Sequence, residues 1–285
     1  MFIPMGILLR DASLKRYAVP APNFMNFKMA KLLIDAASEK RSPLILAYGG
    51  FFLKNSELNT FKEVAEFIRY IANKADIPVA LNLDHSKKIE EVEEAIKSGF
   101  TSVMFDGSTL SYEENVKYTK AAVNMAKYYN VTVEAEIGHV GEGSDYIVQD
   151  DFTEMLTSEQ DARSFVNDTG VHALAVAIGT AHGVYKGEPK LDFERLKRIR
   201  KAVDVPLVLH GGSGTGKDNL RKAVACGIQK INVFTDLINS AKGALVVKKE
   251  ELAKISYFDI VDEMDRAVKN KFVEYIDICG SENRC

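Results

Sequence analysis

Three of the five histidines in this 285-residue chain follow apolar runs that are typical of buried strands: His85, His182 and His210. Three imidazoles that converge on one point leave a fourth coordination position open, which is a common ligand set of a catalytic zinc ion. The rings must be neutral to bind the ion, so binding should weaken as the pH falls. His139 lies in a polar stretch and His172 at a strand start, and we interpret both as structural or solvent-exposed.

A glycine-rich stretch follows the third histidine directly, between its strand and a helix predicted to begin near Lys217. Backbone N–H groups in such a loop can bind a phosphate, and residues without a Cβ let the phosphate approach closely. A glycine also follows the second histidine. We expect a phosphate site built from both segments and from the end of the last strand: Gly183, Gly211, Gly212, Ser213, Asn232, Val233, Phe234 and Thr235.

Asp84 directly precedes the first histidine, so its side chain should point to the opposite face of the strand end. A carboxylate beside a metal-bound substrate can transfer a proton. The alternative interpretation is that Asp84 orients the ring of a metal ligand. We favour proton transfer, which makes Asp84 the expected catalytic residue.

Eight strand-like runs alternate with helical segments, and the runs begin near residues 17, 43, 78, 101, 131, 171, 206 and 228. Strict alternation predicts a parallel sheet, and continuous apolar runs indicate strands covered on both faces. No linker or low-complexity tract interrupts the pattern, so we predict one domain, residues 1–285, with an α/β fold of the (β/α)8 TIM-barrel type. An open, doubly wound sheet is the alternative, weakened because no Gly-x-Gly-x-x-Gly follows the first strand.

Composition narrows the class of protein. The formal net charge is −3, the pI is near 6.0 and no dense run of Lys or Arg occurs, so neither nucleic acid nor an anionic membrane is an expected partner. The apolar start is short and broken by Pro4, unlike a signal peptide, and no run approaches the roughly 20 apolar residues of a membrane span. Three scattered cysteines favour a reducing, cytoplasmic location.

Four segments combine these features in one order along the chain: Leu83–Ser86, Gly179–Gly183, Leu209–Gly214 and Lys230–Val233. At these segments the chain resembles the class II, metal-dependent ketose-bisphosphate aldolases, which are the fructose-bisphosphate and tagatose-bisphosphate enzymes. Further similar segments extend the resemblance over nearly the whole chain: Tyr17–Ala21, Ser102–Asp106, Val133–Gly138 and Tyr185–Pro189.

The resemblance implies one Zn²⁺ per subunit on the three histidines, and Asp84 as the residue that transfers the proton. It implies that the glycine-rich segments hold dihydroxyacetone phosphate. Asp106 and Glu136 match positions for a second or alternative metal location, which would take a second divalent or a monovalent cation. The implied reaction is reversible aldol cleavage of a small phosphorylated sugar, in which zinc stabilises an ene-diolate and no Schiff-base lysine is required. A homodimer or homotetramer is also implied.

Several positions depart from the family pattern. Where the loop after the fifth strand usually carries an acid/base Glu, this chain has Ser144, and Glu142 or Asp145 could substitute for it. Gly49 and Gly50 replace a Ser or Thr that helps to bind phosphate after the second strand. Phe234 replaces a small polar residue, and residues 258–261 lack the Arg that reaches the distal phosphate. The ketone-phosphate half of the site is therefore better preserved than the aldehyde half.

Three functions are compared: an aldolase that acts on one of several substrates, a metal-dependent hydrolase, and a non-catalytic subunit. The substrate could be fructose 1,6-bisphosphate, tagatose 1,6-bisphosphate, or a ketose 1-phosphate without a distal phosphate. A metal-dependent hydrolase on the same barrel usually carries His-x-His after the first strand, where this chain has Pro20–Asn23. A non-catalytic aldolase-like subunit would be favoured by loss of a zinc histidine or of Asp84, and all four residues are present.

Overall fold

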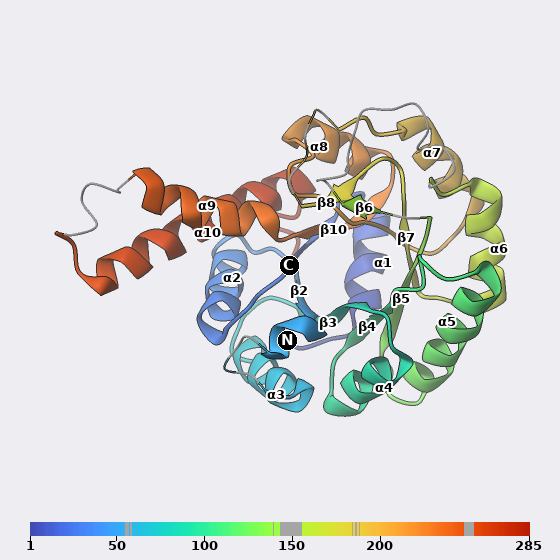
Figure 1. Cartoon of the computed structure of the whole chain (residues 1–285), viewed down its shortest axis with the longest axis horizontal. Coiled ribbons are helices and arrows are strands. Elements are labelled where there is room, and N and C mark those ends of the chain that lie inside the picture. Colours follow the sequence, from blue (N-terminus) through green and yellow to red (C-terminus); the bar gives the residue numbers. More distant parts are fainter. Residues whose placement is uncertain are drawn as a thin grey trace.

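The computed structural model describes residues 1–54, 57, 59–138, 140–142, 156–183, 185, 187, 189–247 and 254–285. Eight parallel strands form one sheet in the spatial order β1-β10-β9-β7-β5-β4-β3-β2, which is the order of a barrel (Figure 1). A parallel bridge between Asn23 and Ala47 joins the two outer strands. The (β/α)8 prediction is confirmed with these strands: β1 (Val19–Pro22), β2 (Leu44–Gly49), β3 (Val79–Ser86), β4 (Ser102–Phe105), β5 (Thr132–Ile137), β7 (Ala173–Val176), β9 (Leu207–Leu209) and β10 (Ile228–Val233).

Helices follow the strands and cover the outside of the barrel (Figure 1). Their ends carry clear sequence signals. Thr60 and Glu63 form a capping box at the start of one helix, Ser158 caps another, and Gly99 ends a third in the left-handed conformation. The covering helices are α2 (Phe27–Glu39), α3 (Phe61–Ala72), α4 (Ile89–Ser98), α5 (Tyr112–Lys127), α6 (Glu159–Thr169), α7 (Phe193–Ala202) and α8 (Lys217–Ala225).

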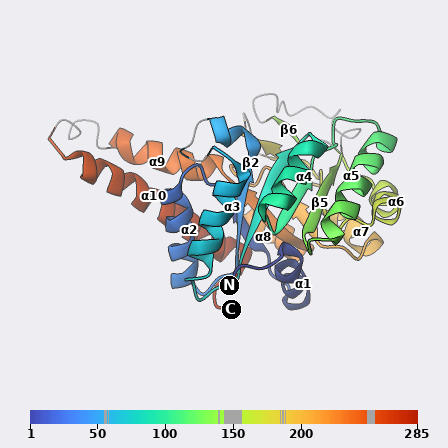
Figure 2. The ribbon, with the colours of Figure 1, turned by 90° about the horizontal axis from the view of Figure 1, so that it is seen from below.

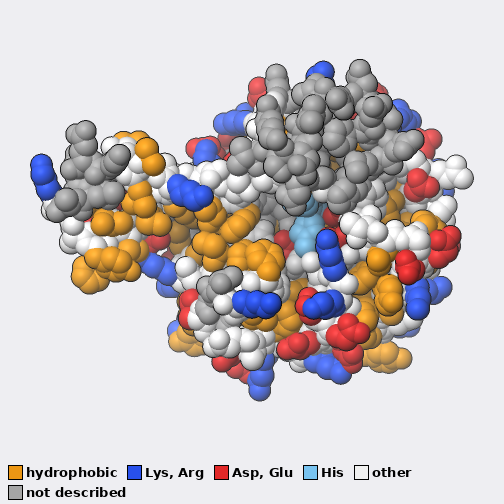
Figure 3. Space-filling model, in the orientation of Figure 1, with side chains coloured by type: hydrophobic (Ala, Val, Ile, Leu, Met, Phe, Trp, Pro, Cys, Tyr) orange, Lys and Arg blue, Asp and Glu red, His pale blue; other side chains and the backbone are white. Residues whose placement is uncertain are grey.

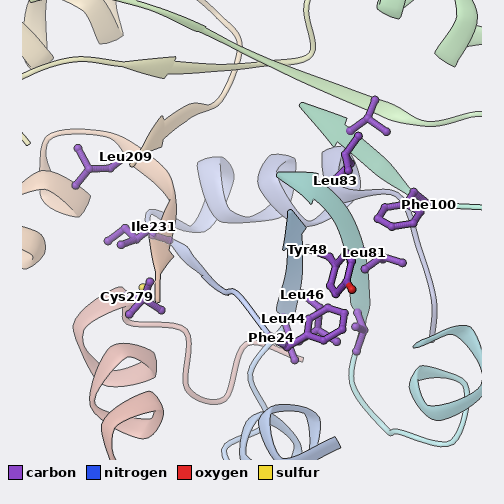
Figure 4. Packing of buried hydrophobic residues seen from close by; sticks show 14 of the residues in the cluster. Phe24, Leu44, Leu46, Tyr48, Leu81, Leu83, Phe100, Leu209, Ile231 and Cys279 are labelled. Carbon is purple, nitrogen blue, oxygen red and sulfur yellow. The ribbon is translucent and has the colours of Figure 1, made fainter. Parts of the chain in front are cut away.

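Alternation along each strand divides the core into two clusters. Outward-facing residues such as Leu44, Leu46, Leu81 and Leu83 belong to the large cluster that lies between strands and helices (Figure 4). Inward-facing residues belong to a smaller cluster that also contains Met5, Leu8, Leu9 and Ala12 of helix α1 (Met5–Lys15): Val19, Ala21, Ile45, Ala80, Ala173, Ala175 and Val208. Helix α1 therefore closes one end of the barrel, opposite strand β6 (Figure 2).

Helices α9 (Thr235–Val247) and α10 (Tyr257–Cys279) form an arm that projects from the barrel (Figures 1 and 2). The base of α10 is buried through Phe272 and Tyr275. At the far end of the arm, four large apolar side chains are exposed: Val246, Val247, Tyr257 and Phe258. Among the described residues, no helix is both long and apolar enough to cross a membrane.

Two small elements were not predicted. Gly50–Lys54 forms the 3-10 helix η1 after β2. Strand β6 (Gly141–Glu142) pairs in parallel with β8 (Ala181–His182), so a two-stranded ladder lies beside the barrel rim. Two-residue strands produce too short a pattern to detect in a sequence.

Candidate active site

His85, His182 and His210 meet at the carboxyl ends of β3, β8 and β9. One ring nitrogen from each can be chosen so that all three lie within 4.8 Å of one another. His182 Nε2 and His210 Nδ1 are buried and have no hydrogen-bond partner among the described residues. Buried polar atoms are rarely left without a partner, and a metal ion bound by these atoms would satisfy both. The geometry fits the predicted Zn²⁺ ligand set, whose metal binding stays a prediction.

Carboxylates orient two of these rings. The Oδ2 atom of Asp106 lies 2.9 Å from His85 Nδ1, and the Oε1 atom of Glu134 lies 2.9 Å from His210 Nε2. A hydrogen bond on one ring nitrogen leaves the lone pair on the other nitrogen for a metal. Burial lowers the pKa of His210, which keeps that ring neutral.

Glu134 also accepts two hydrogen bonds from Lys230 Nζ, at 2.9 and 2.7 Å, and both side chains are fully buried inside the barrel. Burial by itself would raise the pKa of Glu134, but the charge of Lys230 and the hydrogen bond from His210 outweigh it and lower the pKa. The ammonium group of Lys230 thus keeps Glu134 ionised, and the Glu134 carboxylate orients the predicted metal ligand His210. The same ion pair argues against Lys230 as a Schiff-base lysine, because its amine is held as a charged ammonium group.

Asp84 is 5% exposed, and its carboxylate accepts hydrogen bonds from two side-chain amides, one directly after β1 and one on β10. Asn23 Nδ2 donates to one carboxylate oxygen at 2.8 Å, and Asn232 Nδ2 donates to the other at 2.9 Å. Burial would raise the pKa of Asp84, but the neighbouring His85 and Lys230 outweigh it and lower the pKa to about 2. The carboxylate is therefore charged at neutral pH and able to accept a proton.

Asn23 was not predicted as a site residue, although it directly follows the first strand. The side-chain amide of Asn232, which was predicted to bind phosphate, donates instead to Asp84. The sequence signal for both was the same: a polar residue at a strand end, where a barrel builds its active site.

A second group of possible ligands consists of His85, Asp106 and Glu136. Glu136 is 1% exposed, its Oε2 atom has no partner among the described residues, and burial raises its pKa to about 8. A cation beside this carboxylate would favour the charged form. The group fits the predicted second or alternative metal location, which stays a prediction.

The glycine-rich loop packs tightly against its neighbours. A Cβ at Gly211 (φ +67°) would lie 2.4 Å from the carbonyl oxygen of Ala181, and a Cβ at Gly212 would lie 2.5 Å from that of Asn232. Only glycine therefore fits at either position. The Oγ atom of Ser213 accepts hydrogen bonds from the backbone N–H groups of Phe234 and Asp236, which ties the loop to the start of α9.

All residues predicted for the phosphate site line one cavity of about 480 Å³ together with the three histidines and Asp84. Figure 3 shows histidine surface at the base of a hollow beside the barrel rim. Sequence reasoning missed four further lining residues: Phe51, Lys87, Ser108 and Val140.

The acid/base candidates of the strand-five loop are only partly placed. Glu142 pairs with His182 in the β6–β8 ladder, and its side chain lies outside the described part of the structure. Asp145 lies outside the described residues. The role of either residue stays a prediction.

Comparison with known proteins gives one family model, described as fructose-bisphosphate aldolase class-II, which matches residues 4–284. The structure is similar to the YdjI aldolase from Escherichia coli K12, with 35% identity, a TM-score of 0.87 and coverage of 99% of each chain. A putative fructose-1,6-biphosphate aldolase from Coccidioides immitis is 29% identical, with a TM-score of 0.83 and coverage of 97% of this chain and 96% of the other. Fructose-bisphosphate aldolase from Campylobacter jejuni, at 20% identity, a TM-score of 0.82 and coverage of 100% and 97%, shows the shared fold.

Proposed function

This chain belongs to the fructose-bisphosphate aldolase class-II family, and we propose that it catalyses the reversible, zinc-dependent cleavage of a ketose phosphate to dihydroxyacetone phosphate and an aldehyde. The observation that carries the proposal is the convergence of three features in one cavity. These are three histidines with facing ring nitrogens, the buried carboxylate of Asp84 and a glycine-rich loop.

The residues divide the reaction among them. The backbone of the loop 211–213 and the segment 232–235 would hold the phosphate and fix one end of the ketose. Zn²⁺ bound by the three histidines would supply a Lewis acid for the ketone oxygen and for the negative charge that develops there. Asp84 would take the proton from the hydroxyl on C4, the C3–C4 bond would break, and the bond electrons would pass toward the ketone oxygen. A proton returned to C3 then completes dihydroxyacetone phosphate.

Asn23 and Asn232 serve this proton transfer by fixing both carboxylate oxygens of Asp84. Each oxygen keeps a lone pair free, because one amide hydrogen occupies only one acceptor position. A carboxylate held in this way needs little rearrangement when the substrate arrives.

Fructose 1,6-bisphosphate and tagatose 1,6-bisphosphate are the proposed substrates. A ketose 1-phosphate with an unphosphorylated distal end is the second candidate, and one observation favours it. Residues 258–261 lack the Arg that usually reaches the distal phosphate in the family, and the aromatic rings of Phe51 and Phe234 line the cavity. A non-catalytic subunit is the third candidate, and the complete set of histidines with Asp84 argues against it.

The direct test is exchange of the C3 proton of dihydroxyacetone phosphate with solvent, measured by NMR, because exchange requires no aldehyde. EDTA should abolish exchange, and added Zn²⁺ or Co²⁺ should restore it. Exchange that survives chelation and is trapped by borohydride would instead indicate a Schiff-base lysine and would overturn the proposal.

The family also leads us to propose a homodimer or homotetramer. The exposed apolar end of the α9–α10 arm supports this, because a contiguous apolar surface is typical of a contact with another chain. Sedimentation velocity tests it, and a monomer at micromolar concentration would contradict it.

A further inference from the structure

We propose that Lys87 binds an acidic group at the distal end of the substrate, so that the preferred aldehyde carries a carboxylate or a phosphate. The inference rests on the proposed function. It assigns a specificity residue to the aldehyde half of the site, where this chain lacks the family's usual contacts to a distal phosphate. Lys87 follows β3 and lines the cavity.

The strand order places Lys87 opposite the phosphate loop. In the closed order, β9 lies four strands from β3, and β10 lies four strands from β4. The loop 211–213 follows β9, whereas Lys87 follows β3 and Ser108 follows β4. A ketose whose phosphate is held at β9 and β10 therefore extends past the histidines toward the rim that carries Lys87.

Charge supports the same assignment. Among the described residues that line the cavity, Lys87 is the single lysine or arginine. Asp84, Asp106 and Glu136 are the acidic side chains there, and each has a place in the proton-transfer or metal-ligand groups. Lys87 makes no ion pair or hydrogen bond with any described residue, so its ammonium group is available to a ligand.

The described side chains that flank Lys87 offer an anion little competing interaction. On the β1–β2 side, Phe51 packs on Phe52, with ring centroids 4.1 Å apart, and Phe52 packs on Phe234 at 5.4 Å. Ser108 donates its hydroxyl hydrogen to Asp106 at 2.7 Å, so it presents lone pairs rather than a donor. An acidic group at this rim would therefore bind Lys87, while Ser108 could accept a hydrogen bond from a substrate hydroxyl.

The neighbouring residue provides a matched control. Lys88 has the same charge and is 71% exposed, but its ammonium group lies 3.6 Å from Glu91, and it does not line the cavity. A nonspecific effect of positive charge near the rim would appear equally on removal of either lysine, whereas direct binding would appear at Lys87 alone.

The experiment measures kcat/KM for condensation of dihydroxyacetone phosphate with three three-carbon aldehydes: neutral glyceraldehyde, glyceraldehyde 3-phosphate, and tartronate semialdehyde, which ends in a carboxylate. We expect one of the two anionic aldehydes to exceed glyceraldehyde by about tenfold, which is typical of a hydrogen bond to a charged group. Lys87→Met should reduce this ratio of kcat/KM values to about one. Lys87→Arg should retain most of the preference, and Lys88→Met should leave it unchanged. The anion that is preferred identifies the distal group.

Equal kcat/KM for all three aldehydes, or a preference that persists in Lys87→Met, would overturn the inference. Exchange of the C3 proton of dihydroxyacetone phosphate by the unaltered protein is measured alongside. If exchange is absent, the proposed function fails; if exchange is present and the preference is not, the assignment of Lys87 alone fails.

Discussion

The two ends of the barrel interior differ sharply, although the same strands build both. Near α1 the interior is lined by small or branched apolar side chains, including Ile45, Ala80 and Val208. Toward the carboxyl ends, the same faces carry Asp84 on β3 and His210 directly after β9. His210 comes only two positions after Val208, a rise of about 7 Å along a strand.

This difference shows which side chains of the barrel interior stabilise the fold and which reduce its stability in order to form the site. Apolar burial at the α1 end stabilises the barrel directly. Glu134 and Lys230 lie beneath the site, paired with Ala173 and with Val19 and Val208 of the apolar cluster, and both are fully buried charges. Removing two charges from water offsets much of their attraction. The apolar cluster supplies stability, and part of it is used to hold this ion pair beneath His210.

The largest expected effect is at Asp84. Asp84→Ala should lower turnover by roughly 10²–10⁴-fold, because it removes the group that transfers the proton. Metal content, measured by elemental analysis, should stay at one ion per subunit, because Asp84 does not belong to the group of three predicted metal ligands. Near-normal turnover would show that Asp84 serves only to orient its neighbours.

The next effect should arise from the buried ion pair. Lys230→Met leaves the carboxylate of Glu134 buried with His210 as its remaining partner, and should lower the free energy of unfolding by about 3–5 kcal/mol. Urea unfolding measures this change. The double variant Lys230→Met, Glu134→Gln should recover part of the loss because no lone charge remains. A single variant as stable as the unaltered protein would contradict the comparison.

The smallest effect should be at the apolar end. Ile45→Val deletes one buried methylene and should lower the free energy of unfolding by about 0.5–1.5 kcal/mol. Turnover and metal content should not change, because Ile45 lies in the cluster with α1. A loss of metal in this variant would show that the two ends are not independent.

The sequence predicted most of the fold, because each strand is a local apolar run and each helix has local end signals. Eight such units are enough to specify a closed barrel, and the barrel in turn brings His85, His182 and His210 together. The family motifs pointed to the same residues. Helix α10, for example, begins at Tyr257, directly after a capping box formed by Ser256 and Asp259.

The partners of the site residues were not predictable in the same way. Asn23 and Asp84 are 61 residues apart, and Glu134 and Lys230 are 96 residues apart. Such pairs depend on the register of neighbouring strands, which no local pattern records. Lys87 was missed for another reason: a lysine after a strand is usually a solvated surface residue, and its place in the cavity depends on the whole barrel.

The β6–β8 ladder gives the site a thermodynamic link. His182 is at once a predicted metal ligand and the residue that pairs with Glu142, so one backbone position serves both interactions. If the pairing favours the ligand-competent position of His182, metal binding must strengthen the pairing by the same free energy. Occupancy of the ion and the pairing of Gly141 and Glu142 with β8 would then form one coupled equilibrium, in which either event promotes the other.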